Sequence, residues 1–415
     1  MDDTYEQEWR EGYTPATAME EASRCLLCQD APCSQDCPAS TDPAKFIRSI
    51  RFLNEKGAVE TIFENNALGD ICARVCPTER YCQKGCSRTD IDHPIDIKGL
   101  QRYATDYAYD ISMKVLEAGP DTGHSIAIVG SGPAALQAAA SLRCFGHAVD
   151  IYERQPTPGG MLVHGIPAYR LPDDIVNRAI SRVKELGATI HCDVSIGTGP
   201  NDDITIGQLL GKHDAVLLDP GLSEGKMLPI FKDNDNVKLA VDFLDEVRSS
   251  KGTMKVPDNV LVIGGGDVAM DVSTTLKKLG VPTVTDVIWE RSCEFLASKE
   301  ELDGTREMGV TLIDGYEPKE TSGHQVTFKH RVIDSTLTIS ADLIILAVGQ
   351  RPDLDHLGVD LDLKGVEMAQ EGPATSDPHI FVTGDIAQGD KTVVWAVRRG
   401  KEAAGAIDAS LKGGE

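Results

Sequence analysis

The spacing of apolar residues divides the chain into a helical N-terminal part and a longer part in which strands and helices alternate. Within 14–118 the apolar positions follow helical periodicity, as in Pro43 to Ile50, and strand-like runs are almost absent. From Ser125 onward, β-branched apolar runs alternate with helical stretches, the pattern of a doubly wound parallel sheet. This pattern occurs twice, at 125–153 and 259–290, and predicts two α/β folds behind a small helical domain.

Length and charge narrow the class of protein. At 415 residues the chain exceeds one ordinary hydrophobic core. Its net charge of −24, without any run of Lys and Arg, offers no attraction to nucleic acid or anionic membranes. The first residues lack the basic and apolar regions of a secretory signal, and no stretch approaches the roughly 18 apolar residues of a membrane span. We expect a soluble, cytoplasmic protein.

Eight of the eleven cysteines form two sets near the N-terminus. The sets read Cys25-x2-Cys28-x4-Cys33-x3-Cys37-Pro38 and Cys72-x3-Cys76-Pro77-x4-Cys82-x3-Cys86. Such thiolates bind iron–sulfur cubanes, and in bacterial ferredoxins the cysteine before proline serves the other cluster. We therefore predict two [4Fe–4S] clusters that exchange ligands. Structural zinc is the alternative, although its cysteines usually come as two Cys-x2-Cys pairs separated by a longer loop.

The first strand–turn–helix unit carries a dinucleotide fingerprint. The strand from Ser125 runs into Gly130-Ser131-Gly132-Pro133-Ala134-Ala135, the spacing G-x-G-x-x-A. Gly130 permits the tight turn, Gly132 lets the backbone approach a pyrophosphate, and Ala135 permits close helix–strand contact. A second strand ends at Glu153, where a carboxylate would accept hydrogen bonds from an adenosine ribose. These features together predict a dinucleotide site.

A second copy of the unit runs from Asn259 to Ala269, and its second strand also ends in an acid, Glu290. Two such folds, the second inserted into the first, match a flavin disulfide-reductase-like architecture in which an NAD(P)H domain interrupts the FAD domain. The first fold resumes at Ile380 to Asp385, a strand followed by Gly-Asp. In this architecture that aspartate reaches the ribityl chain of FAD, and the helix from Thr392 points its N-terminus at the isoalloxazine.

Four segments follow from this organisation. A turn-rich stretch, Gly119 to Gly123, is the expected linker after the helical domain. We predict a helical domain with two [4Fe–4S] clusters at 1–118, the first part of the FAD domain at 119–226, the NADH domain at 227–346 and the second part of the FAD domain at 347–415.

With eight cysteines, two fingerprints and a late Gly-Asp in this order, the whole chain resembles the glutamate synthase small-subunit superfamily. The runs Cys33 to Pro43, Asn65 to Gly69 and Cys76 to Glu79 are most similar to the N-terminal part of dihydropyrimidine dehydrogenase and its short bacterial subunit. The resemblance covers nearly all of the chain. It implies an α/β protein with an N-terminal α-helical iron–sulfur domain and two Rossmann-like dinucleotide-binding domains, the NADH domain inserted into the FAD domain.

The resemblance also implies the residues that bind each cofactor. One cluster would be held by Cys25, Cys28, Cys33 and Cys86, and the other by Cys37, Cys76, Cys82 and Gln101, which leaves Cys72 without a metal role. FAD would be bound by Ser131, Gly132, Pro133, Ala134, Ala135, Glu153, Gly160, Met161, Arg170, Ile196, Gly384, Asp385, Thr392 and Val393. NADH would be bound by Gly265, Gly266, Asp267, Val268, Ala347, Val348 and Gly349. The charges of Glu290 and Arg291, at the end of the second strand, add these two residues to the expected nucleotide site. Where many relatives have Ala-Thr-Gly, this chain has Leu218-Asp219-Pro220-Gly221.

The end of the second fold indicates which nicotinamide cofactor binds. In NADPH-using relatives the positions of Trp289 and Glu290 are basic and bind the 2′-phosphate. A carboxylate accepts hydrogen bonds from a free 2′-hydroxyl but repels a phosphate, so we expect a preference for NADH. Arg291 lies one residue further on and would permit some NADPH activity. The alternative is that Glu290 and Arg291 only pair with each other at the surface.

The function implied by the resemblance is electron input to a dihydropyrimidine dehydrogenase, with NADH oxidised through FAD and the clusters. A PreA-like subunit with FMN and iron–sulfur clusters, in a heterotetramer, would reduce uracil or thymine, because no pyrimidine-binding barrel fits after Ala404. The cofactors carry the hydride chemistry, so we expect no catalytic side chain. The alternatives are a glutamate synthase small subunit feeding an amidotransferase, and a zinc- and nucleotide-binding regulator without redox activity.

Overall fold

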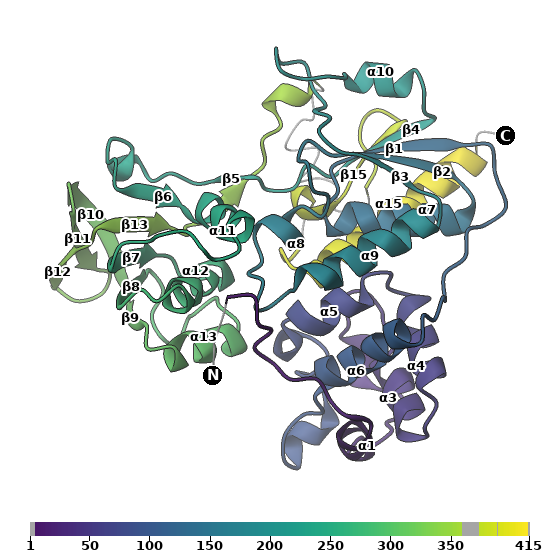
Figure 1. Ribbon diagram of the computed structural model, residues 1–415, viewed down its shortest axis with the longest axis horizontal. Helices are drawn as coiled ribbons and strands as arrows, with labels where there is room; N and C mark the ends of the chain where they lie inside the picture. Colours follow the sequence, from purple (N-terminus) through teal and green to yellow (C-terminus); the bar gives the residue numbers. More distant parts are fainter. Residues whose placement is uncertain (1–4, 359–372, 388, 414–415) are drawn as a thin grey trace. The chain divides into compact units, whose positions relative to one another are not determined.

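The computed structural model describes residues 5–358, 373–387 and 389–413, which form two compact units (Figure 1). Unit 1 contains residues 5–9, Val163–Pro172 and Leu222–Pro352. Unit 2 contains Arg10–Leu162, Asp173–Gly221 and the described part of Asp353–Glu415. The four predicted domain boundaries stay predictions, because these units are defined by contacts and not by cofactor content.

The N-terminal part of unit 2 is helical, as its periodicity predicts. Its helices are α1 (Pro15–Ser23), α2 (Pro32–Gln35), α3 (Pro43–Arg51), α4 (Glu55–Phe63), α5 (Gly69–Val75) and α6 (Ile97–Asp110), with 3₁₀ turns η1 (Thr78–Arg80) and η2 (Ser87–Asp90). Side chains cap several of these helices: Asp42 accepts the N–H of Lys45, and Asn54 accepts the N–H of Gly57. Phe46, Ile62 and Leu100 lie in the shared core, so the helices pack through one apolar face each.

The rest of unit 2 is a parallel sheet with strand order β15-β4-β1-β2-β3. Its strands are β1 (Ser125–Val129), β2 (Ala148–Tyr152), β3 (Thr189–His191), β4 (Ala215–Leu218) and β15 (Ile380–Val382). Its helices are α7 (Pro133–Phe145), α9 (Asp173–Glu185), α10 (Ile206–Leu210) and α15 (Val393–Lys412), with 3₁₀ turns η4 (Asp355–Leu357) and η6 (Gly384–Ile386). The short helix α8 (Met161–His164) begins in unit 2 and ends in unit 1. Because β15 pairs with β4, a strand from the end of the chain completes the sheet that began at Ser125. The predicted interruption of the first fold is therefore confirmed.

Unit 1 contains a second parallel sheet, of order β6-β13-β7-β8-β9. Its strands are β6 (Val237–Leu239), β7 (Asn259–Ile263), β8 (Thr283–Ile288), β9 (Thr311–Asp314) and β13 (Leu343–Leu346), and its helices are α11 (Ala240–Ser249), α12 (Asp267–Lys278) and α13 (Lys299–Glu307). Antiparallel strands β10 (Tyr316–Ser322), β11 (Gln325–His330) and β12 (Thr336–Ser340), the pair β5 (Glu224–Gly225) and β14 (Gln350–Arg351), and η3 (Pro229–Phe231) complete it. The α/β class and the two Rossmann-like folds are confirmed.

Two distant segments join unit 1 through aromatic contacts. The N–H of Trp9 donates to the carbonyl of Tyr169 at 3.1 Å, and the two rings lie 5.4 Å apart. The ring of Tyr5 packs edge-on against the same Tyr169, which is fully buried. Aromatic pairs of this kind stabilise by about 0.5–1.5 kcal/mol beyond their burial. Among the described residues, no helix has the length and apolar character needed to cross a membrane.

Candidate cofactor sites

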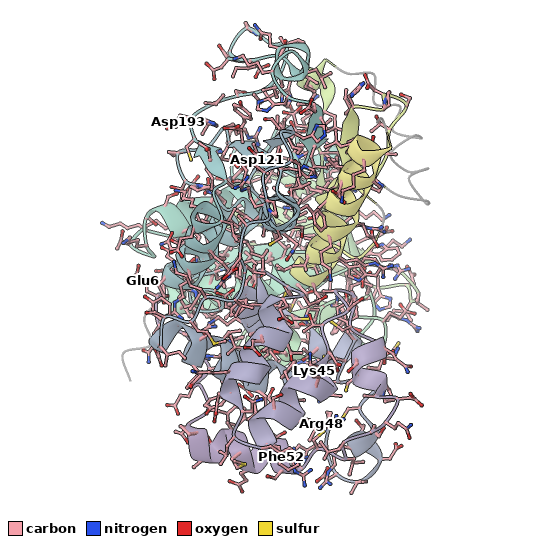
Figure 2. All side chains as sticks on the ribbon, turned by 90° about the vertical axis from the view of Figure 1, so that its right-hand side faces the viewer. Glu6, Lys45, Arg48, Phe52, Asp121 and Asp193 are labelled. Atoms are coloured by element: carbon pink, nitrogen blue, oxygen red, sulfur yellow. The ribbon has the colours of Figure 1, made fainter. Side chains whose placement is uncertain are left out.

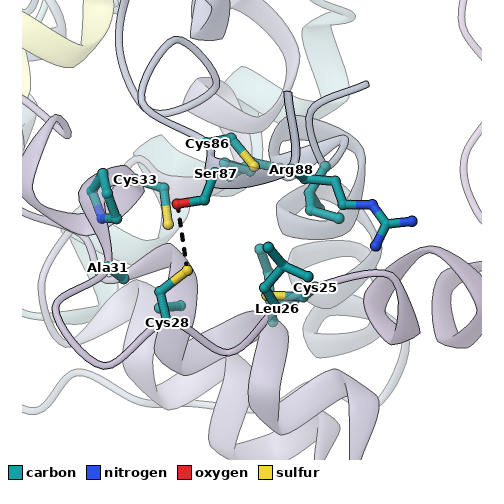
Figure 3. Close-up of a pocket in the computed structure, with 13 residues that line it drawn as sticks. Cys25, Leu26, Cys28, Ala31, Cys33, Cys86, Ser87 and Arg88 are labelled. Carbon is teal, nitrogen blue, oxygen red and sulfur yellow. Dashed lines mark hydrogen bonds between the residues drawn. The ribbon is translucent and has the colours of Figure 1, made fainter. Parts of the chain in front are cut away.

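Four cysteines from both sequence runs line one pocket of unit 2. Cys25, Cys28 and Cys33 from the first run face Cys86 from the second, and α3 contributes to the pocket wall (Figure 3). All four are partly exposed, and the Cys28 thiol lies 3.6 Å from the hydroxyl of Ser87. We call these four cysteines the outer set. They are the residues proposed for the first cluster.

The other four N-terminal cysteines form an inner set. Cys72, Cys76 and Cys82 are buried, and each lies close enough to Cys37 for the charges of the two thiols to interact. Cys37 comes from the first run, so each set takes members from both runs. The amide of Gln101 donates from Nε2 to the carbonyl of Gly69 at 2.7 Å, which leaves its own carbonyl oxygen for another partner.

Burial disfavours the charged form of cysteines in both sets, so thiolates at these positions need a neighbouring positive charge such as a metal would supply. Burial raises the pKa of Cys33 to about 11 and that of Cys72 to about 12, and it also raises the pKa values of Cys76 and Cys82. Neighbouring thiols add to the shift, because each disfavours a second negative charge. A bound metal removes that penalty, since coordination deprotonates a thiol outright.

The first glycine-rich turn is held by its middle residue. The Ser131 hydroxyl donates to Glu153, and the Ser131 N–H donates to the same carboxylate oxygen at 3.1 Å. The N–H of Gly159 in turn donates to the Ser131 hydroxyl at 2.9 Å. A Cβ on Gly160 would lie only 3.0 Å from the Cα of Gly132. Bare backbone therefore lines this turn, as the close approach of a pyrophosphate requires.

The departure at 218–221 places a carboxyl at the same turn. Asp219 is buried and accepts the N–H of Ala135, in the first turn of α7, at 2.9 Å. Any Cβ on Gly384 would clash with Asp219, and Gly384 has a φ of +73° that favours glycine. Burial raises the pKa values of Asp219 and Asp385. Burial therefore disfavours the charged form of both carboxyls at the turn where a pyrophosphate would bind.

The remaining predicted FAD residues lie in several places. Pro133 and Ala134 begin α7, Met161 begins α8, buried Ile196 bridges to Ile204, and Thr392 and Val393 stand at the N-terminus of α15. Arg170 belongs to unit 1, where its buried guanidinium binds both carboxylate oxygens of Asp271 at 2.7 Å and Glu301 at 2.7 Å. A contact of Arg170 with FAD stays a prediction.

The second glycine-rich turn brings together most of the predicted NADH residues. A Cβ on Gly265 would lie 2.3 Å from a carboxylate oxygen of Glu290, so any side chain at 265 would displace the Glu290 carboxylate. A Cβ on Gly264 would lie 2.4 Å from the carbonyl oxygen of Ala347, so residues 347–349 lie beside this turn. Gly266 faces open space, and Asp267 and Val268 begin α12 behind it. The turn and its acid thus lie together, and a Cβ on Gly266 would meet no atom within 4 Å.

The side chains of Glu290 and Arg291 do not pair with each other. Arg291 binds Glu294 at 3.0 Å, and Arg331 stacks on the Trp289 ring at 3.3 Å from its centroid. Within the described ranges the Glu290 carboxylate makes no ion pair, so it is available to a ribose. The alternative that Glu290 only neutralises its neighbour is therefore not what the structure shows.

Two further contacts near the predicted sites were not anticipated. The Tyr81 hydroxyl donates to Asp390 at 2.6 Å and lies 3.5 Å from the Thr392 hydroxyl. Lys401 on α15 donates to the carbonyl of Ala39 at 2.9 Å and lies close enough to Cys37 for an electrostatic interaction. Tyr81 directly precedes a predicted ligand, which is a signal in the sequence. Lys401 carries no such signal.

Together, the interrupted parallel sheet, the inserted second sheet and their two glycine-rich turns define a pyridine nucleotide-dependent flavoprotein behind a cysteine-rich helical domain. The family described as pyridine nucleotide-disulphide oxidoreductase matches residues 124–400, and dihydropyrimidine dehydrogenase domain II, 4Fe-4S cluster, matches residues 2–113. The chain belongs to the pyridine nucleotide-disulphide oxidoreductase family, within the group formed by the PreT proteins.

Individual relatives support this placement. The NAD-dependent dihydropyrimidine dehydrogenase subunit PreT homolog of Salmonella typhi is 51% identical over 403 residues, 97% of this chain and 96% of that protein. Subunit PreT of Escherichia coli K12 is 49% identical over 99% of this chain and 98% of its own length. The glutamate synthase [NADPH] small chain of the same strain is 29% identical, over 96% of this chain and 92% of its own.

Solved structures agree on the fold. Thioredoxin reductase from T. acidophilum matches with a TM-score of 0.54 and 18% identity, over 70% of this chain and 99% of its own. Mycobacterium tuberculosis FprA in complex with NADPH matches with a TM-score of 0.55 and 19% identity, over 72% of this chain and 86% of its own. At these identities the likeness concerns the fold alone.

Proposed function

We propose that the chain is the electron-input subunit of a dihydropyrimidine dehydrogenase, which oxidises NADH and delivers electrons to a partner subunit. The observation that carries the proposal is the crossed arrangement of the cysteine sets in the same unit as the first dinucleotide fold. Relatives named PreT share about half of their residues with this chain over nearly its full length. The glutamate synthase relatives are more distant.

The residues at the two turns would bind and orient the nucleotides. Ser131 and Glu153 fix the first turn, which would receive FAD, and Glu290 would accept the adenosine 2′-hydroxyl of NADH. FAD and the iron–sulfur clusters, when bound, supply the redox chemistry that links a two-electron donor to one-electron carriers. The protein contributes placement, charge and exclusion of water.

The order of the sites along unit 2 supports electron delivery. The inner set adjoins the N-terminus of α15 through Tyr81, whose hydroxyl contacts Asp390 beside Thr392. The outer set is the more exposed of the two. Residues for the inner cluster thus lie beside the predicted flavin end, and residues for the outer cluster lie where a partner has access.

The partner in this proposal is a PreA-like subunit with FMN, iron–sulfur clusters and the pyrimidine site, assembled with this chain as a cytoplasmic heterotetramer. The relatives are themselves named as subunits, which supports the need for a partner. No pyrimidine-binding barrel is found within the part of the chain that the structure describes.

The decisive experiment mixes the purified chain with a purified PreA-like subunit and follows NADH consumption. We expect oxidation that depends on uracil or thymine, and the reverse reaction with a dihydropyrimidine and NAD⁺. Alone, the chain should reduce dyes but not pyrimidines. Pyrimidine-independent rates, together with glutamate formation when a glutamate synthase large subunit replaces the partner, would favour the glutamate synthase alternative.

The ligand proposal has its own test, which compares Gln101→Ala with Cys72→Ala. Anaerobically prepared wild-type protein should hold one FAD and about eight irons if both cysteine sets carry cubanes. Gln101→Ala should lose about half of the iron, whereas Cys72→Ala should keep it. Iron analysis and absorbance near 400 nm measure both. Equal iron loss in the two variants would assign Cys72 to the inner cluster.

A further inference from the structure

Helix α3 forms one wall of the outer cysteine pocket. Ala44 and Ile47 line the pocket, and Arg51 donates from Nη1 to the carbonyl of Cys25 at 2.9 Å. With 3.6 residues per turn, these three positions lie on one side of the helix. Side chains on the other sides of α3 therefore lie close to the outer set.

A neighbouring side of α3 is exposed and carries cations and large apolar side chains. Lys45, Arg48 and Phe52 follow the spacing i, i+3, i+7 and project along one face (Figure 2). Phe52 is 66% exposed and the adjacent Leu53 is 70% exposed. Lys56, in the first turn of α4, is also exposed. We call these five residues the α3 patch.

The cations of the α3 patch have no ionic partners. Within the described residues, Lys45, Arg48 and Lys56 make no ion pair, whereas Arg24 and Arg88 near the same pocket both bind Asp92.

The two carboxylates in this stretch are already engaged. Asp42 caps α3 and accepts the hydroxyl of Ser34, and Glu55 accepts the hydroxyl of Tyr103. The three cations of the patch therefore have no ion-pair partner among the described residues, in a chain of net charge −24.

We propose that the α3 patch is the docking surface for the electron-accepting partner subunit. The partner would present acidic side chains to Lys45, Arg48 and Lys56 and an apolar depression to Phe52 and Leu53. Exposed aromatic side chains within a charged rim are typical of protein interfaces, and opposite charges speed encounter and set register. Docking here would place the partner beside the outer set.

The proposal rests on the proposed function, and the observations favour a protein over other occupants. A second copy of this chain would bring another net charge of −24, which opposes association. A membrane-surface helix needs a long apolar face with many basic residues, whereas α3 has nine residues and only Phe52 and Leu53 exposed at its end.

The test compares patch variants with charge-matched controls. Lys45→Glu/Arg48→Glu and Phe52→Ser change the patch. Lys212→Glu/Lys255→Glu makes the same charge change at exposed lysines elsewhere, and Ile333→Ser removes an apolar side chain that is 59% exposed. All variants should keep wild-type iron content and NADH-dependent dye reduction, which shows that the cofactor sites are intact.

The readout is pyrimidine-dependent NADH oxidation at increasing concentrations of a PreA-like subunit. Each patch variant should raise the partner concentration needed for half-maximal rate about tenfold, with little change at saturation. The wild-type rate at limiting partner should fall with added salt, and the double variant should show a flatter dependence. The controls should match wild type.

Several results would overturn the proposal. One is a patch variant that needs no more partner than the controls do. Another is that wild type binds phosphatidylglycerol vesicles, and a patch variant loses this binding but keeps an unchanged partner titration. A third is that wild type self-associates in sedimentation, and a patch variant loses this self-association but keeps an unchanged partner titration. If wild type shows no pyrimidine-dependent turnover with the partner, the proposed function fails instead, whatever the variants do.

Discussion

Each of the two glycine-rich turns follows a strand, has the spacing G-x-G and lies near an acid at the end of the next strand. The contacts of that acid differ between the two turns. At the first turn the middle residue is Ser131, and Glu153 is buried and already accepts Ser131 N–H, the Ser131 hydroxyl and Gln155 N–H. At the second turn the middle residue is Gly265, and Glu290 approaches it without accepting a hydrogen bond within the described ranges.

This contrast matches what a permanently bound cofactor and an exchanging one would each require. The Glu153 carboxylate is already ordered by three donors before a nucleotide binds. Little conformational entropy is then lost on binding, so the nucleotide binds more tightly and dissociates more slowly. The half-buried carboxylate of Glu290 has no such donors in the described structure, so it would lose conformational freedom only when a ribose binds. We infer that the first turn suits a permanently bound FAD and the second suits NADH, which must leave after each turnover.

The largest expected effect comes from removing the held acid. Glu153→Ala leaves two N–H groups and one hydroxyl without an acceptor in a buried site, at a cost of about 1.5–3 kcal/mol for a hydrogen bond to a charged group. We expect loss of FAD during gel filtration and a lower urea midpoint. Glu290→Ala should keep its FAD and stay within about 0.5 kcal/mol of wild type. Similar losses in both variants would remove the distinction between the turns.

An intermediate effect is expected on nucleotide choice. Trp289→Arg/Glu290→Lys removes a carboxylate and adds two cations where a 2′-phosphate would lie. The ratio of kcat/KM for NADH to that for NADPH should fall by about 10–100-fold, or about 1.4–2.8 kcal/mol. Arg291→Gln should change the ratio much less, because Arg291 is bound to Glu294. A large effect of Arg291→Gln would show instead that this arginine reaches the nucleotide.

The smallest effect concerns buried carboxyls beside the two turns. Asp219 accepts the Ala135 N–H, whereas one oxygen of Asp286 on β8 has no partner in the described structure. Burial raises the pKa of Asp286 above its unfolded value. Its neutral form therefore stabilises the fold below about pH 4, and this contribution is lost as pH rises through the folded pKa.

Asp286→Asn removes that titration and should gain stability relative to wild type as pH rises from about 4.5 to 7.5. The expected gain is about 1 kcal/mol, the lower end of the cost of an unsatisfied buried group. Urea unfolding at both pH values measures it. Asp303→Asn, at a 47% exposed side chain, should show no such trend. A gain that is the same at both pH values would exclude titration of Asp286 as its cause.

Local patterns predicted the fold, and long-range contacts limited the prediction of the sites. Strands β1 and β7 and their turns were predictable, because alternation and glycine spacing act within a few residues. The return of the first fold at β15 was predictable from the late Gly-Asp.

The partners of Arg170 were not predictable in this way. Asp271 and Glu301 lie on two different helices about 100 or more residues away, and no local spacing points to them. The same reason applies to Tyr81 and Asp390. The predicted ligand and nucleotide residues therefore stay proposals to be tested one by one.

The exchange of cysteines between the two runs has a consequence for biogenesis. Because Cys37 belongs to the inner set and Cys86 to the outer set, each iron site would tie both runs together and close a long loop of chain. Neither site can be completed until the second run has left the ribosome, and iron insertion then contributes directly to folding. Because both sites take ligands from the same two runs, oxidative loss of one cluster would also loosen the segment that carries ligands of the other.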